Sequence, residues 1–175
     1  MIDWKAPLRE CRICPRACGI DRTAGARGFC GAGTLVRVAR TMLHRWEEPC
    51  LIGAHGAGAV FFSHCTLRCV YCQNHEISRG ERGDLLSVEE LAERFLELES
   101  QGAATLDLVT PTHYTPQILA ALELARTAGF SRPVVWNTSG YETVETISLL
   151  NGHVDIYLPD LKYDNEESAC RCSAA

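Results

Sequence analysis

Three cysteines stand close together near the middle of the chain: Cys65, Cys69 and Cys72, with three and then two residues between them. They directly follow a short apolar run that we expect to be a strand. Three thiolates on one short loop can bind three corners of a cubane iron–sulfur cluster and leave the fourth iron open to a substrate. A structural zinc site needs four ligands, so His64 or His75 would have to supply the fourth. The spacing therefore favours a 4Fe–4S cluster, with zinc as the alternative.

A second group of cysteines lies nearer the N-terminus, among prolines and glycines that favour turns. Its four members are Cys11, Cys14, Cys18 and Cys30. Four thiolates at close spacing suit a closed metal site, and both zinc and an auxiliary iron–sulfur cluster accept such a set. Residues 1–50 show little periodicity, so we expect an irregular segment organised by this second metal rather than by an apolar core.

The composition is that of a folded protein with an unusual number of thiols. Of the 175 residues, 46% are hydrophobic, 22% are charged and ten are cysteines. The apolar fraction excludes disorder as the main state, and no apolar run is long enough to cross a bilayer. The N-terminus lacks an apolar export signal, so the expected location is the cytoplasm. There, many cysteines indicate metal or redox chemistry rather than disulfides.

Charge is distributed unevenly along the chain. Residues 1–45 carry nine Lys and Arg against three acids, whereas the whole chain has a net charge of −5. The basic segment could meet an anionic partner, but balancing nearby cluster thiolates is the interpretation we favour. Nucleic-acid binding is not expected, because the rest of the chain is acidic and lacks exposed aromatic residues among its basic ones.

From about residue 58 the pattern alternates between strands and helices. Strands are predicted at 60–63, 105–110, 134–138 and 154–158, and helices at about 87–101, 115–128 and 142–150. Ser87 and Glu90 form a capping box for the first helix, and Thr115 is expected to cap the second. This order predicts an α/β fold with about four βα units and a parallel sheet. In such folds the chemistry lies at the carboxyl ends of the strands.

Polar residues follow the predicted strands at these ends. Among these residues are Thr110, Thr112, His113, Asn137, Thr138, Asp160 and Lys162. After them the chain is polar and shows no further strand. We therefore expect a metal-binding segment at 1–50, an incomplete core at 51–165 and a ragged tail at 166–175.

Several strings of the sequence resemble one enzyme family. FFSHCTLRCVYCQNHEIS, TPTHYTPQI, NTSGYE and VDIYLPDLKY occur in this order. Together they are similar to the radical SAM (S-adenosylmethionine) superfamily, in the branch related to pyruvate formate-lyase-activating enzymes. The resemblance implies a partial (β/α) barrel and a 4Fe–4S cluster held by the three central cysteines. Its open iron is chelated by SAM, and one electron cleaves SAM to a 5′-deoxyadenosyl radical that abstracts a hydrogen.

The resemblance also implies partners and SAM contacts. The partners are a protein substrate of the glycyl radical enzyme class and an electron donor such as flavodoxin or ferredoxin. Relatives often carry Gly-Gly-Glu at the second strand tip, where this chain has Thr110-Pro111-Thr112-His113. Asn137, Thr138, Asp160 and Lys162 match positions that contact SAM or a cation. Because relatives have more βα units, the alternative is a non-catalytic metal-binding module or an inactive fragment of such an enzyme.

Overall fold

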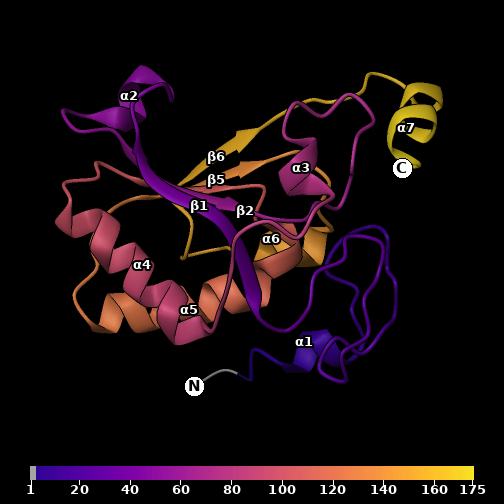
Figure 1. The fold of residues 1–175 in the computed structure, drawn as a ribbon, viewed down its shortest axis with the longest axis horizontal. Coiled ribbons are helices and arrows are strands. Elements are labelled where there is room, and N and C mark those ends of the chain that lie inside the picture. Colours follow the sequence, from indigo (N-terminus) through magenta and orange to yellow (C-terminus); the bar gives the residue numbers. More distant parts are fainter. Residues whose placement is uncertain (1–2) are drawn as a thin grey trace.

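A six-stranded mixed sheet organises the chain in the computed structural model, which describes residues 3–175. The strands are β1 (Val36–His44), β2 (Ala57–Phe62), β3 (Asp84–Leu86), β4 (Leu106–Val109), β5 (Val134–Thr138) and β6 (Ile156–Pro159). Their order across the sheet is β3-β1-β2-β4-β5-β6 (Figure 1). Strands β2, β4, β5 and β6 pair in parallel, whereas β1 pairs antiparallel with both β2 and β3. The result is a mostly parallel α/β sheet.

The structure contains short and long helices, and the long ones pack on the sheet. They are α1 (Ala6–Arg9), α2 (Pro49–Ile52), α3 (His75–Ser78), α4 (Val88–Ser100), the 3₁₀ helix η1 (Thr112–Tyr114), α5 (Thr115–Thr127), α6 (Val144–Leu149) and α7 (Glu166–Ser173). Helices α4, α5 and α6 lie against one face of the sheet (Figure 1). The Ser87 side chain accepts a hydrogen bond from Glu90 N, and the Glu90 carboxylate accepts one from Ser87 N. This confirms the predicted capping box.

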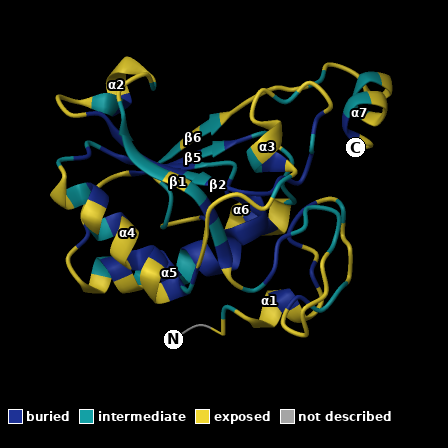
Figure 2. Ribbon diagram, in the orientation of Figure 1, coloured by how far each residue is buried: buried dark blue, intermediate teal, exposed yellow. Residues whose placement is uncertain are grey.

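The apolar core lies between these helices and the sheet, as the buried stripe in Figure 2 shows. Phe95 of α4 and Leu122 of α5 pack into it, and Trp136 of β5 is fully buried. Burying such side chains contributes about 2 kcal/mol each. The opposite face of β2, β4 and β5 is left to carry the polar groups described below.

The N-terminal segment is more regular than its sequence predicts. Strand β1 lies within residues 1–50 and pairs with β2 along most of its length. Val36 and Val38 of this strand belong to the main core. The sheet therefore crosses the predicted boundary near residue 50, and the division into segments stays a prediction.

Two further expectations differ from the structure. The tail at 166–175 contains helix α7, whose N-cap Asn165 accepts a hydrogen bond from Ser168 N. Thr115 is the first residue of α5 rather than its cap, and its hydroxyl donates to Thr112 O. The turn of η1 continues directly into α5, which moves the cap to Tyr114.

Strand β6 forms one edge of the sheet, so the described strands make an open sheet and closure into a barrel is not shown. Over residues 3–175, no helix combines the length and apolar character needed to cross a membrane.

Candidate functional site

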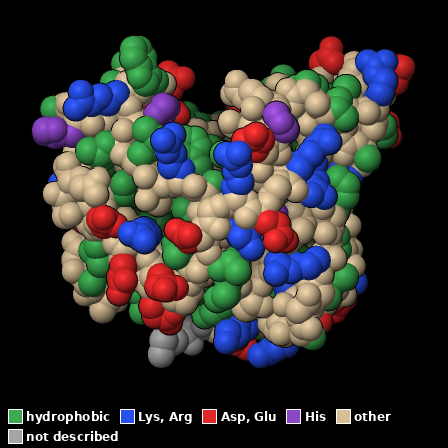
Figure 3. Space-filling view, in the orientation of Figure 1, with side chains coloured by type: hydrophobic (Ala, Val, Ile, Leu, Met, Phe, Trp, Pro, Cys, Tyr) green, Lys and Arg blue, Asp and Glu red, His purple; other side chains and the backbone are tan. Residues whose placement is uncertain are grey.

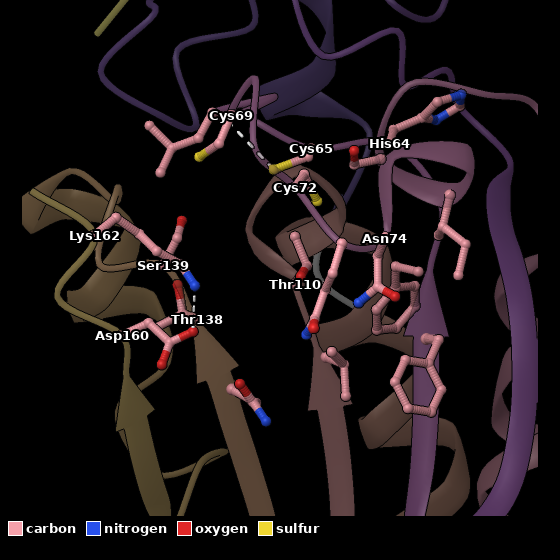
Figure 4. A pocket seen from close by; sticks show the side chains of 18 of the residues that line it. His64, Cys65, Cys69, Cys72, Asn74, Thr110, Thr138, Ser139, Asp160 and Lys162 are labelled. Carbon is pink, nitrogen blue, oxygen red and sulfur yellow. Dashed lines mark hydrogen bonds and ion pairs between the residues drawn. The ribbon is translucent and has the colours of Figure 1, made fainter. Parts of the chain in front are cut away.

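A cavity of about 540 Å³ lies at the carboxyl ends of the parallel strands. Figure 4 shows its wall of cysteines facing polar residues from other strand tips. In the space-filling view the surface is hollowed between α2 and α3 (Figure 3). The polar and sulfur-bearing residues of its lining include His44, Glu47, His64, Cys65, Cys69, Cys72, Asn74, Thr110, Asn137, Thr138, Asp160 and Lys162.

The loop after β2 brings three thiols to this cavity. Cys65 and Cys69 are buried and Cys72 is partly exposed, and all three line the cavity wall. The loop turns sharply, because His64 and Arg68 adopt the left-handed backbone region with φ of 75° and 54°. Residues other than glycine rarely adopt this conformation, and it is often associated with functional sites. We call residues 65–72 the cluster loop.

Hydrogen bonds to sulfur favour thiolates on the cluster loop. Leu67 N and Arg68 N both donate to Cys65 Sγ, over 3.4 and 3.5 Å. Burial nevertheless raises the pKa of Cys65 above its usual value. Burial also pushes the pKa of Cys69 upward, but hydrogen bonds from the hydroxyls of Ser173, Tyr163 and Tyr71 outweigh it and the net pKa is lowered. Cys69 therefore ionises more readily than Cys65.

The arrangement of the thiols suits a cluster. In a cubane cluster each thiolate binds a different iron, so the three sulfurs need to border a larger volume. Cys65, Cys69 and Cys72 border such a volume, because all three line the large cavity. They therefore fit a 4Fe–4S cluster.

Five of the seven predicted contact residues face the thiols across the cavity. They are Thr110, Asn137, Thr138, Asp160 and Lys162. Thr112 and His113 are not brought to this cavity, because η1 turns the chain away directly after Pro111. The Thr112 hydroxyl donates to Glu142 Oε1 over 2.6 Å. His113 is buried on the other side and hydrogen-bonds Ser63 O through Nε2 at 2.8 Å.

Asp160 and Lys162 form an ion pair at the tip of β6, with Nζ and Oδ2 2.5 Å apart. Burial disfavours the charged ammonium of Lys162, but the hydrogen bond and charge of Asp160 outweigh this and raise its pKa. Lys162 is therefore a cation at neutral pH. The pair is too exposed to contribute much stability. Both residues line the cavity, so the pair is within reach of a group bound there.

Comparisons with known proteins agree with this geometry. The sequence profile of the Radical SAM superfamily matches residues 59–172, which include the cluster loop and the carboxyl ends of β2, β4, β5 and β6. The chain belongs to the radical SAM superfamily. Membership implies a 4Fe–4S cluster and SAM as cofactors. The matched range contains Cys65, Cys69 and Cys72, which line the cavity.

An uncharacterized protein of Methanocaldococcus jannaschii is similar over most of this radical SAM chain. The two are 31% identical over 173 residues, which is 95% of this chain and 49% of the relative. The chain thus spans about half the length of the curated relative it matches. No solved structure matches the chain significantly.

The sequence analysis missed several residues of the radical SAM cavity. His44 and Glu47 reach it from the end of β1 and the segment after it, and Asn74 reaches it from the turn before α3. Only the antiparallel pairing of β1 with β2 brings His44 and Glu47 there, and no short-range signal reveals that pairing. Glu142 does not line the cavity, but its Oε1 accepts hydrogen bonds from the hydroxyls of Thr112 and Thr138.

Asp107 is the most unusual polar residue near the cavity. It is fully buried in β4, and neither carboxylate oxygen has a hydrogen-bond partner among the described residues. It lies two residues before Val109, which lines the cavity, so its side chain is on the same face of the sheet. Burial, followed by the nearby charge of Glu47, raises the pKa of Asp107 to about 7, and the side chain of Asn137 opposes this rise only in part. It is therefore partly protonated at neutral pH.

The four N-terminal cysteines line a second, much smaller cavity together with Arg22 and His113. Burial is the main cause that raises the pKa of Cys14 to about 11 and also raises that of Cys30. All ten cysteines of the chain are free, so no disulfide competes for these thiols.

Proposed function

We propose that this chain provides the cluster-binding and SAM-binding part of a cytoplasmic radical SAM enzyme that activates a glycyl radical enzyme. One observation carries the proposal. Three thiols at the end of β2 and polar side chains at the tips of β4, β5 and β6 border the same cavity. The finer assignment to the branch of pyruvate formate-lyase-activating enzymes rests on the sequence motifs alone.

In this proposal Cys65, Cys69 and Cys72 hold the 4Fe–4S cluster and leave one iron without a protein ligand. When bound, the cluster supplies the electron that cleaves SAM to methionine and a 5′-deoxyadenosyl radical. The protein contributes the hydrogen bonds that Cys65 Sγ accepts from backbone N–H groups and that Cys69 Sγ accepts from Ser173. Such bonds stabilise added negative charge and so help to set the potential.

The remaining strand tips orient the methionine end of SAM. Lys162 is the one Lys or Arg among the described residues that line the cavity, so it pairs with the SAM carboxylate. Asp160 holds the Lys162 ammonium in place through their ion pair. Oxygen atoms of Thr110 and Asn137 accept from the SAM ammonium, a role that an acid plays in relatives with Gly-Gly-Glu.

The partners belong to the same proposal. A radical formed in contact with water is quenched, so the substrate and further parts of the fold have to cover the open cavity. We propose a protein substrate bearing the glycyl site and a small electron donor such as flavodoxin or ferredoxin. Since the chain spans about half of its relative, we expect a longer form to be needed for coupled turnover.

The test is anaerobic reconstitution with iron and sulfide, then reduction in the presence of SAM. Chromatography quantifies 5′-deoxyadenosine, and EPR follows a glycyl radical on the added partner protein. We expect 5′-deoxyadenosine from a longer form of this protein that matches the relative in length. We expect much less from the 175-residue chain. A reconstituted long form that binds SAM but never cleaves it supports the alternative of a non-catalytic metal-binding module.

A further inference from the structure

The four N-terminal cysteines surround a cavity of about 10 Å³, roughly the size of one water-sized sphere. Four cysteines around so small a volume suit one ion held between them. We propose that Cys11, Cys14, Cys18 and Cys30 bind one divalent thiophilic ion, of which zinc is the expected one, and that the buried Arg22 is its counter-ion. The inference does not depend on the proposed SAM chemistry.

The backbone is already folded around this cavity. Cys11 N donates to Ile20 O and Gly19 N donates to Cys11 O, both over 2.9 Å, so the chain doubles back beside Cys11. Ala17 N donates to Cys14 O over 2.9 Å and closes a turn between Cys14 and Cys18. These bonds hold the first three thiols on one short, looped segment.

The segment that carries Cys30 forms another part of the wall of this small cavity. A Cβ at Gly28 would lie only 2.8 Å from Cys18 Sγ, so the absent side chain is what lets this sulfur approach the segment. Gly31 N donates to Gly28 O over 3.0 Å and forms the turn that carries Cys30. A larger residue at position 28 would occupy the place of the Cys18 sulfur.

Arg22 supplies the observation that points to a charged ligand. Its side chain is almost fully buried, with 1% of the residue exposed. Its Nη1 donates to His113 O over 2.7 Å and its Nη2 to Gly33 O over 2.6 Å, while Nε has no partner. It forms no ion pair with any carboxylate in residues 3–175.

A guanidinium is always charged in proteins, and a buried charge needs a compensating one. The Tyr114 ring, 5.8 Å away, offers only a weak interaction. The nearest sulfur is Cys11 Sγ, 3.9 Å from Nη1. Four neutral thiols would leave Arg22 uncompensated, whereas four thiolates around a divalent ion carry a net negative charge. A bound ion thus explains the cysteines and the buried arginine together.

The sulfurs line the cavity but do not yet converge on one point, because no group of three or more ligating side chains surrounds an ion position within the described residues. Binding therefore requires rotation about the Cα–Cβ bonds of the cysteines. The backbone already places all four cysteines around the same small volume.

The segment that carries the four N-terminal cysteines contacts the cluster loop. Arg16 Nε donates to Thr66 O over 3.1 Å, and Arg68 Nη1 donates to Phe29 O over 2.9 Å. The Arg16 guanidinium also stacks on the Phe29 ring, 3.8 Å from its centre. Because residues 65–72 are held by the segment that carries Cys30, the ion would fix the position of the cluster loop.

Metal analysis of the anaerobically prepared holoprotein tests the proposal. We expect one zinc per chain, lost in Cys14→Ser and kept in Cys69→Ser, which loses iron instead. Cys50→Ser, at an exposed thiol on α2, is the control that keeps both metals. Iron loss in Cys14→Ser with no zinc in the wild type would overturn the proposal in favour of an auxiliary cluster.

The role of Arg22 has its own test. Arg22→Gln removes the charge and leaves a shorter polar side chain, so a chromogenic chelator should extract zinc roughly tenfold faster than from the wild type. The matched control is Arg12→Gln, because Arg12 lies on the same segment but is exposed and paired with Glu10. Equal rates for the two variants would show that Arg22 is not the counter-ion.

A third experiment uses only the wild-type protein, so it does not depend on whether the cysteine variants fold. Wild-type protein freed of zinc by a chelator should regain one equivalent of Co²⁺ with a thiolate-to-cobalt absorption band. Its residues 1–50 should be cut by trypsin before cobalt is added and protected afterwards. If no absorption band appears, the proposed metal site is wrong. If the digestion pattern is unchanged after verified zinc removal, the metal does not organise residues 1–50.

Discussion

Ser173 donates a hydrogen bond from Oγ to Cys69 Sγ over 3.1 Å and so joins the end of α7 to the cluster loop. A second bond runs between the same segments, from Val70 N to Cys172 O over 2.9 Å. Two residues far apart in sequence thus set the environment of one proposed cluster ligand. The hydroxyl of Ser173 is placed to stabilise negative charge on this sulfur.

Ser173→Ala should lower the reduction potential of the reconstituted cluster. A hydroxyl that donates to a ligand sulfur stabilises the reduced cluster more than the oxidised one, because the reduced cluster carries more negative charge. We expect a shift on the order of tens of millivolts to more negative values. Redox titration followed by EPR measures it. Ser148→Ala is the control, since its hydroxyl donates to Val144 O on the surface of α6. Equal shifts in both variants would contradict the assignment.

Each cysteine of the cluster loop should be indispensable for iron binding. Replacing Cys65, Cys69 or Cys72 by Ala removes one of three protein ligands, so the visible absorption of the oxidised cluster and the EPR signal of the reduced one should be lost. Cys50→Ala should retain both, because Cys50 lies in neither cavity. If the triple variant still takes up the full iron content, the cluster is bound elsewhere.

The cluster loop and the strands around it could be predicted from the sequence because their signals are local. The spacing of Cys65, Cys69 and Cys72 lies within eight residues, and the capping box of α4 within four. Strand β5 was predicted with its observed bounds, and the strand ends at Thr110, Asn137 and Asp160 were placed at the cavity.

The missed features depend on contacts between distant residues. In strand β1, Val36 pairs with Leu86 and His44 pairs with Ala57. No sequence pattern within the strand predicts those partners. Glu47 reaches the cavity only because of this pairing. His113 was expected to face the site, but the single turn of η1 directs it to the opposite side, where it is fully enclosed.

Lys162→Met should weaken SAM binding. Removing the ammonium leaves the SAM carboxylate without a charged partner, and a charged hydrogen bond of this kind is worth about 2 kcal/mol, so we expect at least a roughly tenfold loss of affinity. Isothermal titration of the reconstituted, unreduced protein with SAM measures it. Lys5→Met, on the N-terminal segment, is the control. Unchanged affinity in Lys162→Met would remove this residue from the site.

Asp107 should make the protein less stable as the pH rises. Its pKa is raised from 3.8 to about 7 by burial and then by the charge of Glu47. Between these two values the unfolded chain releases a proton that the folded protein retains. Stability therefore falls as the pH rises from about 4 to about 7, and the loss persists at higher pH. From pH 6 to pH 8 it amounts to a cost on the order of 1 kcal/mol.

Asp107→Asn should remove this component, because the amide does not ionise. The free energy of unfolding by urea, measured at pH 6 and at pH 8 with iron content checked at both, gives the comparison. We expect the free energy of unfolding of the variant, minus that of the wild type, to be larger at pH 8 than at pH 6. Any constant change in stability that the buried amide causes is the same at both pH values and does not affect this comparison. Asp164→Asn, at an exposed aspartate after β6, should reproduce the wild-type profile. Parallel profiles for Asp107→Asn and the wild type would mean that Asp107 ionises alike in the folded and unfolded chains, and that a partner at the cavity satisfies its charge.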